Sequence, residues 1–134
     1  MARIAAFAYA LALAFARHAY GQTDEEVAAR LTPAVHTCER AQENNGTLQQ
    51  ALCYKDEVDR QDQRLNRTWA AVISGLSPDR RETLRRGERE WLKQRDADCH
   101  HEAAGYANAT AAYMFNLCMA NETIRRTIWL ERAH

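Results

Sequence analysis

Residues that interrupt regular structure are scarce in this chain, which has only two prolines and five glycines among 134 residues. Few points therefore force a helix to end, and the scarcity favours long helices. Common catalytic signatures are also missing: the chain has no P-loop, no G-x-S-x-G, no C-x-x-C and no glycine-rich dinucleotide turn. These absences argue against the enzyme classes that depend on such motifs, and we expect that the protein is not an enzyme.

Long hydrophobic runs are absent as well. An apolar run from Ile4 to Ala16 ends at Arg17 after 13 residues, whereas a membrane-spanning helix needs roughly 20 apolar residues. We therefore expect no membrane span. A short apolar run preceded by Arg3 and followed by polar residues is typical of a secretory signal. The sequence predicts a signal peptide at residues 1–21 and a mature domain at 22–134, located in the periplasm or secreted.

Surplus charge is small. The whole chain has 18 basic and 18 acidic residues, and cleavage would remove Arg3 and Arg17, leaving 16 basic residues against 18 acidic ones. Nucleic acids are recognised by clustered surplus basic charge, so no nucleic-acid partner is expected. The second predicted helix is rich in arginine, but glutamates are interleaved, and Glu82 precedes Arg86 by four residues. That spacing forms favourable helical pairs and indicates a solvated face.

The chain has only four cysteines: Cys38, Cys53, Cys99 and Cys118. An even number in a short exported chain indicates two disulfides. The successive separations of 15, 46 and 19 residues provide no pair that would start a zinc site, and we expect no metal and no cofactor. Three pairings are possible, and we favour Cys38–Cys53 with Cys99–Cys118 because each would join neighbouring helical segments.

The few helix-breaking residues mark the ends of the predicted helices. Ser77-Pro78 offers an N-cap followed by proline at the first helical position, Asn44-Asn45-Gly46 interrupts the chain, and Gly105 ends another run. Pro33 lies in or at the edge of a short helix. The predicted long helices cover 48–76, 78–104 and 110–132, and the short one lies near 24–40. This pattern predicts an all-α, disulfide-stapled, up-down-up bundle of three long helices plus a short N-terminal helix.

Each long helix has an apolar stripe at helical spacing. Cys53 lies about 100° from the stripe of its helix, so we expect it to reach sideways to the segment of Cys38. The stripes consist of Val58, Leu65, Trp69, Val72, Ile73 and Leu76 on the first helix, Leu84, Trp91, Leu92 and Cys99 on the second, and Tyr113, Leu117, Ala120, Ile124 and Ile128 on the third.

Two charged residues, Asp62 and Arg95, fall within these stripes. If the first two long helices run antiparallel about Ser77-Pro78, the two positions face each other. An unpaired buried charge costs several kcal/mol. We therefore predict a buried ion pair between Asp62 and Arg95, and we interpret it as structural scaffolding.

The motif around these two residues resembles that of the LprI-type lysozyme-inhibitor-like family, over roughly residues 38–132. Members have D-x-x-L-N on one helix, W-x-x-x-R-D-x-x-C on the next, and further cysteines on either side. Trp69 stands where the family usually has tyrosine. The matching residues are Asp62, Leu65 and Asn66 in the first motif, Trp91, Arg95, Asp96 and Cys99 in the second, and Cys38, Cys53 and Cys118 outside them.

The resemblance implies a small exported bacterial protein that binds and inhibits lysozyme or another envelope hydrolase. A non-inhibitory envelope adaptor or ligand-binding module is the alternative. An inhibitor would plug the lysozyme cleft, which holds two catalytic carboxylates, with a rigid loop or a basic side chain. The candidate loops are Gly105–Ala112 and Asn44–Thr47, although plain connectors are the more common role of such loops. His100, His101 and Glu102 lack metal-site spacing and indicate a polar helix end.

Overall fold

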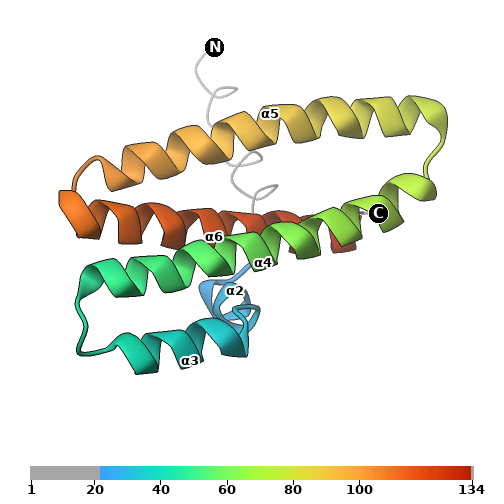
Figure 1. The fold of residues 1–134 in the computed structure, drawn as a ribbon. Coiled ribbons are helices and arrows are strands. Elements are labelled where there is room, and N and C mark those ends of the chain that lie inside the picture. Colours follow the sequence, from blue (N-terminus) through green and yellow to red (C-terminus); the bar gives the residue numbers. More distant parts are fainter. Residues whose placement is uncertain (1–21, 134) are drawn as a thin grey trace, which may run out of the picture.

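The computed structural model describes residues 22–133, which fold into helices joined by short turns (Figure 1). No strand occurs among these described residues, and the all-α prediction is confirmed. The predicted signal peptide at residues 1–21 lies outside the described part of the chain. The helices are α2 (Asp24–Ala29), α3 (Pro33–Gln42), α4 (Thr47–Ser74), α5 (Pro78–Ala103) and α6 (Asn108–Ala133).

The N-terminal segment contains two helices, whereas the sequence predicted a single one near 24–40. Pro33 occupies the first turn of α3, and proline disfavours a helical conformation in the residue before it. Thr32 is extended and caps α3 by accepting a hydrogen bond from the amide of Val35 at 3.4 Å. The chain therefore breaks between α2 and α3 and turns there.

α6 is the central helix of the fold. α4 and α5 diverge from the turn at residues 75–77, and α6 packs against both of them, while α3 packs on α4 and α2 on α6 (Figure 1). α4 and α6 run in one direction and α5 in the other, which is the predicted up-down-up order. None of the helices within residues 22–133 is long and apolar enough to cross a membrane.

The core follows α6. Ile124 and Ile128 are almost fully buried and pack with Val27 of α2, and Leu130 packs with Leu65 of α4 and Leu84 of α5. The predicted stripe of α5 is wrong at Leu92, which is 39% exposed. Because α4 and α5 diverge, their facing sides are not fully covered along the whole length of α5.

A buried carboxylate fixes the break between α2 and α3. Glu57 of α4 is 0% exposed and accepts hydrogen bonds from the amide and the hydroxyl of Thr32, at 2.9 and 2.5 Å. It also accepts from Arg60 at 2.8 Å and from Gln61 at 2.7 Å. Gln61 is 1% exposed and donates as well to the carbonyl of Arg30 at 3.0 Å. Side chains of α4 thus replace the backbone partners that the broken helix lacks.

These hydrogen bonds also set the ionisation of Glu57. Burial by itself would raise the pKa of Glu57, but the hydrogen bonds from Thr32, Arg60 and Gln61 outweigh it and hold this pKa below its ordinary value. The carboxylate is therefore charged at neutral pH. Burial of Glu57 and Gln61 could not be expected from the sequence pattern, because both are polar and lie beside the predicted stripe.

Candidate functional site

Both disulfides form in the pairing that we favoured. Cys38–Cys53 joins α3 to α4 with 5.7 Å between Cα atoms, and Cys99–Cys118 joins α5 to α6 with 5.5 Å. Each bond encloses one of the two turns proposed as candidate loops. Both turns are therefore held at their bases by covalent links.

The guanidinium of Arg95 connects all three long helices. Its Nη1 lies 3.1 Å from Asp62 Oδ1 of α4 and donates to the hydroxyl of Thr123 on α6 at 3.0 Å. Its Nε donates to Asp96 at 3.1 Å. Arg95 is 8% exposed, whereas the side chain of Asp62 is 41% exposed. The expectation of a pair buried at both ends is therefore wrong for Asp62, which lies at the edge of the interface.

A more deeply buried ion pair was not predicted. Arg126 of α6 lies 2.7 Å from Glu88 of α5, and their side chains are 12% and 13% exposed. The Arg126 guanidinium also stacks over Trp129 at 4.0 Å and lies 5.3 Å from the ring centre of Trp91. Arg95 lies 5.1 Å from that same Trp91 ring. Trp91 is thus contacted by two arginines.

Most of the family motif lies around one small groove of about 240 Å³ between α4 and α5. Trp91 is outside the groove and packs on the cluster of Leu65, Leu84 and Leu130, and Asp96 is 54% exposed beside Arg95. The groove is lined by the motif residues Asp62, Leu65, Asn66, Trp69 and Arg95, together with Glu88 and Leu92.

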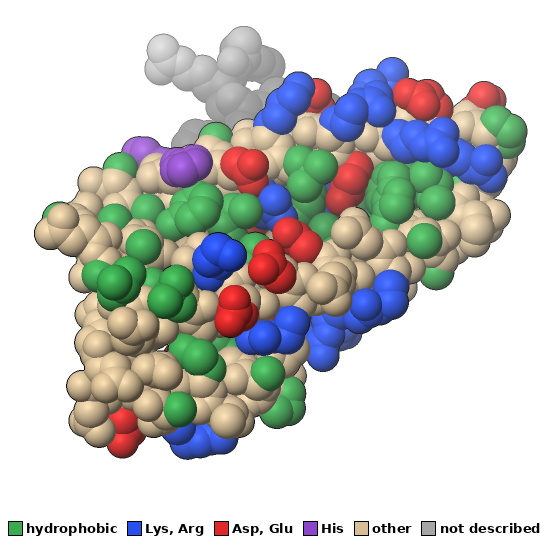
Figure 2. Space-filling model, viewed as in Figure 1, with side chains coloured by type: hydrophobic (Ala, Val, Ile, Leu, Met, Phe, Trp, Pro, Cys, Tyr) green, Lys and Arg blue, Asp and Glu red, His purple; other side chains and the backbone are tan. Residues whose placement is uncertain are grey.

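Two stretches of the chain that meet at one end of the bundle carry no charged side chain. Residues 44–54 and 103–121 contain no Asp, Glu, Lys, Arg or His, in a chain of which 27% is charged. The first stretch includes the turn between α3 and α4 except for the exposed Glu43 that begins it, and the second includes the turn between α5 and α6. Figure 1 shows both turns at the same end. In Figure 2 this end is mainly uncharged, while most Lys and Arg side chains gather over the opposite half. We call these two stretches the uncharged end.

Exposed apolar side chains are concentrated at the uncharged end. Leu48 is 54% exposed, Leu52 49% and Tyr106 48%, and Leu92 is the only other large hydrophobic residue exposed within the described part. Exposed apolar groups gathered in one place commonly mark interaction surfaces. The sequence pattern indicated both turns as loops but not that they lie at the same end of the bundle.

Contacts between α4 and α6 hold this end in place. The rings of Tyr54 and Tyr113 meet edge to face, with centroids 5.3 Å apart, and the side-chain amide of Asn116 donates to the carbonyl of Ala51 at 3.0 Å. Burial, followed by the nearby carboxylate of Glu39, raises the pKa of Tyr54, so its ring remains neutral. The end is therefore built on packed and hydrogen-bonded helices.

The backbone adopts a positive φ angle at each of the two turns. Gly46 has a φ of 88° at the start of α4, and Asn108 has a φ of 52° at the start of α6. Glycine and asparagine are the residues that most readily adopt such left-handed conformations. These two positions therefore define the shapes of the turn tips.

The histidines and the basic face of α5 were the other positions considered from the sequence. His100 stacks against Phe115 with centroids 4.6 Å apart, and no three His, Cys, Asp or Glu side chains within residues 22–133 are grouped to hold a metal ion. On the basic face of α5, Arg89 lies near Glu82 and Lys93 near Glu90, at 3.5 and 3.2 Å. These are exposed pairs of the kind that contributes little to stability.

Comparison with known proteins identifies the family. A search of curated proteins and a search of solved structures found no match. A family model described as "Lysozyme inhibitor LprI" matches residues 38–130. This segment includes all four cysteines, both motifs and both turns of the uncharged end. The match covers more than half of the chain, and the protein therefore belongs to the LprI family of lysozyme inhibitors.

Proposed function

We propose that this protein is an exported bacterial inhibitor of lysozyme that acts by binding, and that the uncharged end is its binding surface. Family membership supports the activity. The choice of surface rests on two disulfide-enclosed turns at the same end of the bundle, whose charge-free stretches expose Leu48, Leu52 and Tyr106.

The composition of the uncharged end resembles the centre of a protein interface. Such centres are depleted of charged residues and enriched in tyrosine and methionine, and tyrosine is frequent among the residues that dominate binding energy. Tyr106 is half exposed at one turn, and Leu52 is half exposed one turn into α4. A surface already fixed by disulfides loses less conformational entropy when it binds.

The chemistry of the turn tips suits a cleft that contains two carboxylates. Retaining and inverting glycosidases both place two carboxyl groups beside the sugar chain. Asn44 and Asn108 offer side-chain amide N–H groups, and Tyr106 offers a hydroxyl, that can donate hydrogen bonds to such carboxylates. The side-chain amide of Asn45 already donates to Gln42 at 2.8 Å. The two stretches of the uncharged end contain no acidic residue, and the exposed Glu43 beside Asn44 is the acid nearest to them in the α3–α4 turn. The tips supply neutral donors, so the basic plug considered from the sequence is not part of this proposal.

The family motif then has a supporting role. We infer that Asp62, Trp91, Arg95 and Asp96 hold α4, α5 and α6 at a fixed spacing through the contacts of the Arg95 guanidinium. This spacing determines how the turn of α3–α4 lies relative to the turn of α5–α6.

Lysis of a suspension of lysozyme-sensitive bacteria, followed by turbidity, tests the inhibition. Purified protein is added to c-type, g-type and i-type lysozymes, and we expect slower lysis with at least one of them. Unchanged lysis rates at micromolar protein would contradict inhibition and favour the alternative of a non-inhibitory envelope adaptor or ligand-binding module.

Matched variants test the surface. Leu52→Asp and Tyr106→Asp place a charge in the uncharged end, and each should weaken inhibition by at least tenfold. Leu92→Asp is the control, because Leu92 is also an exposed leucine but lies in the α4–α5 groove. Loss of inhibition in Leu92→Asp alone would indicate that lysozyme binds at the α4–α5 groove of the family motif and not at the uncharged end.

We also propose that the chain is exported and that its signal peptide is removed. The protein recovered from the periplasm or the culture medium should begin near Gln22. Recovery of the intact chain from the cytoplasm alone would contradict export.

A further inference from the structure

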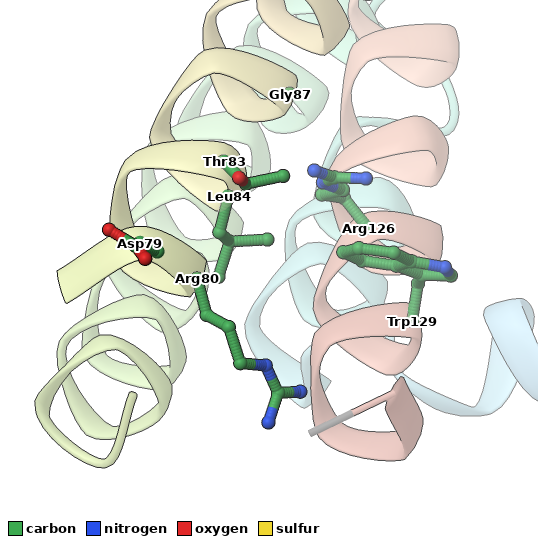
Figure 3. Close-up of a pocket in the computed structure, with 7 residues that line it drawn as sticks. All are labelled: Asp79, Arg80, Thr83, Leu84, Gly87, Arg126 and Trp129. Carbon is green, nitrogen blue, oxygen red and sulfur yellow. The ribbon is translucent and has the colours of Figure 1, made fainter. Parts of the chain in front are cut away.

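A second hollow, separate from the uncharged end and from the motif groove, lies between the first half of α5 and the last part of α6. Its volume is about 530 Å³, which lies within the range of roughly 300–1,000 Å³ typical of sites for small molecules. Figure 3 shows the lining residues: Asp79, Arg80, Thr83, Leu84 and Gly87 from α5, and Arg126 and Trp129 from α6.

Gly87 leaves the space open on the side of α5. It lies in the middle of a 26-residue helix, where glycine costs about 1 kcal/mol relative to alanine. A Cβ atom added at Gly87 would meet no atom within 4 Å. Helix packing therefore does not require glycine here, and any side chain at this position would occupy the hollow.

The inner wall of the hollow is apolar. Leu84 is 7% exposed, and its side chain points towards the ring of Trp129 (Figure 3). The guanidinium of Arg126 lies over that ring at 4.0 Å and is paired with Glu88 at 2.7 Å. The charge of Arg126 is thus balanced within the protein, and its flat face continues the wall.

The mouth of the hollow has an unbalanced positive charge. Arg80 makes no ion pair with any of the described residues, and neither do the exposed Arg85 and Arg86 on the same helix. Asp79 is the only acid in the lining, and its carboxylate points away from α6 (Figure 3). An apolar ligand with an anionic group would complement this combination of wall and mouth.

We propose that this hollow binds a single-chain carboxylate amphiphile of fatty-acid type. The hydrocarbon chain lies against Leu84 and Trp129, in the space left by Gly87, and the carboxylate accepts hydrogen bonds from Arg80. This site is independent of the proposed inhibition, since the uncharged end lies at the opposite end of α5.

Calorimetric titration of the chain from Gln22 to His134 with decanoate, below its micelle concentration, tests the proposal. Decanoate should bind with one site per chain, decanol and decyltrimethylammonium should bind at least tenfold more weakly, and acetate should not bind detectably. Equal binding of decanoate and decanol would overturn the role of the charge. An absence of decanoate binding would overturn the site, and so would binding only to vesicles of anionic phospholipid.

Variants locate the site on the structure. Gly87→Phe should abolish decanoate binding by filling the hollow, and Arg80→Gln should weaken it at least fivefold. Arg85→Gln is the control, since Arg85 is not in the lining, and it should bind as the wild type does. Unchanged binding in both Gly87→Phe and Arg80→Gln would place decanoate elsewhere and refute the proposal.

A measurement on the wild type is independent of how the variants fold. The indole N–H signal of Trp129 in the NMR spectrum, assigned with Trp129→Phe, should shift on addition of decanoate. An unchanged Trp129 signal at saturating decanoate would refute the proposal even if every variant proved unstable.

Discussion

Replacement of Glu57 by glutamine should destabilise the fold strongly, although the two side chains have nearly the same shape. The carboxylate accepts four hydrogen bonds, two on each oxygen: Thr32 N–H and Gln61 on Oε1, and the Thr32 hydroxyl and Arg60 on Oε2. Glutamine has one carbonyl oxygen, so its amide group would face two of these donors. The Thr32 hydroxyl and Arg60 would then face N–H groups in place of an acceptor, and Arg60 would lose its carboxylate partner.

The magnitude follows from the donors that remain unmatched. Each buried group without a partner costs about 1–3 kcal/mol, and loss of the charge removes the stronger, charge-assisted bonds. We expect Glu57→Gln to lower the free energy of unfolding by about 3 kcal/mol, within the range for breaking a buried ionic contact. Urea unfolding followed by far-ultraviolet circular dichroism measures it. Asp59→Asn is the control, because Asp59 is an exposed acid on the same helix, and its effect should remain within about 0.5 kcal/mol.

The pH dependence of this difference provides a second test. The pKa of Glu57 is lower in the folded state than its ordinary value of 4.5, so the unfolded chain takes up this proton first as the pH falls. The stabilisation by Glu57 is therefore complete above pH 4.5 and is lost as the pH falls through the depressed pKa. The gap between wild type and Glu57→Gln should narrow below pH 4.5. A loss under 1 kcal/mol at pH 7, or a gap that does not change between pH 7 and pH 3, would show that a charged Glu57 does not stabilise the fold.

Three further predictions concern the helices and their links. Arg95→Met should lower the free energy of unfolding in urea by about 3 kcal/mol, because the buried guanidinium connects three helices. Asp62→Asn should lower it by less than about 1 kcal/mol, because the Asp62 side chain is 41% exposed. Equal losses in the two variants would contradict this difference. Gly87→Ala should stabilise the protein by about 1 kcal/mol in thermal unfolding, because the added Cβ meets no atom within 4 Å; a lower melting temperature would contradict it. Replacement of both Cys99 and Cys118 by serine opens a 19-residue loop. This double variant should lose about 3 kcal/mol of unfolding free energy in urea. A double variant as stable as wild type would show that the disulfide does not constrain the unfolded chain.

The ends of the long helices and the disulfide pairing could be predicted because their determinants are local. Pro78 starts α5 and the residues around Gly46 start α4, so the bounds of these two helices differ from the predicted ones by at most two residues. Cys38 and Cys53 lie on either side of a single turn, as do Cys99 and Cys118. Neighbouring antiparallel helices therefore bring each pair together without information from distant segments.

The buried polar groups could not be predicted because their partners are distant. Glu57 receives its hydrogen bonds from Thr32, 25 residues away, and one of these donors is a backbone amide that has no sequence signature. Glu88 pairs with Arg126, 38 residues away, so the pattern of α5 alone assigns it to the solvated basic face. Leu92 follows the apolar stripe, yet it is exposed because α4 and α5 diverge.

The uncharged end could be predicted only in part. Its signal is present in the sequence, since residues 44–54 and 103–121 are the two charge-free stretches that flank the turns. Their proximity depends on α4 and α6 running in the same direction, so that the starts of both helices lie together (Figure 1). The pattern therefore became interpretable as one surface only with the packing of the helices.

Hydrogen–deuterium exchange of the protein, measured with and without the lysozyme that it inhibits most strongly, shows whether lysozyme binds to the uncharged end. We expect slower exchange in the lysozyme complex at residues 44–54 and 103–112, with no change along the middle of α5. Protection confined to the α4–α5 groove around Asn66 and Leu92, or no protection at any lysozyme concentration, would contradict it.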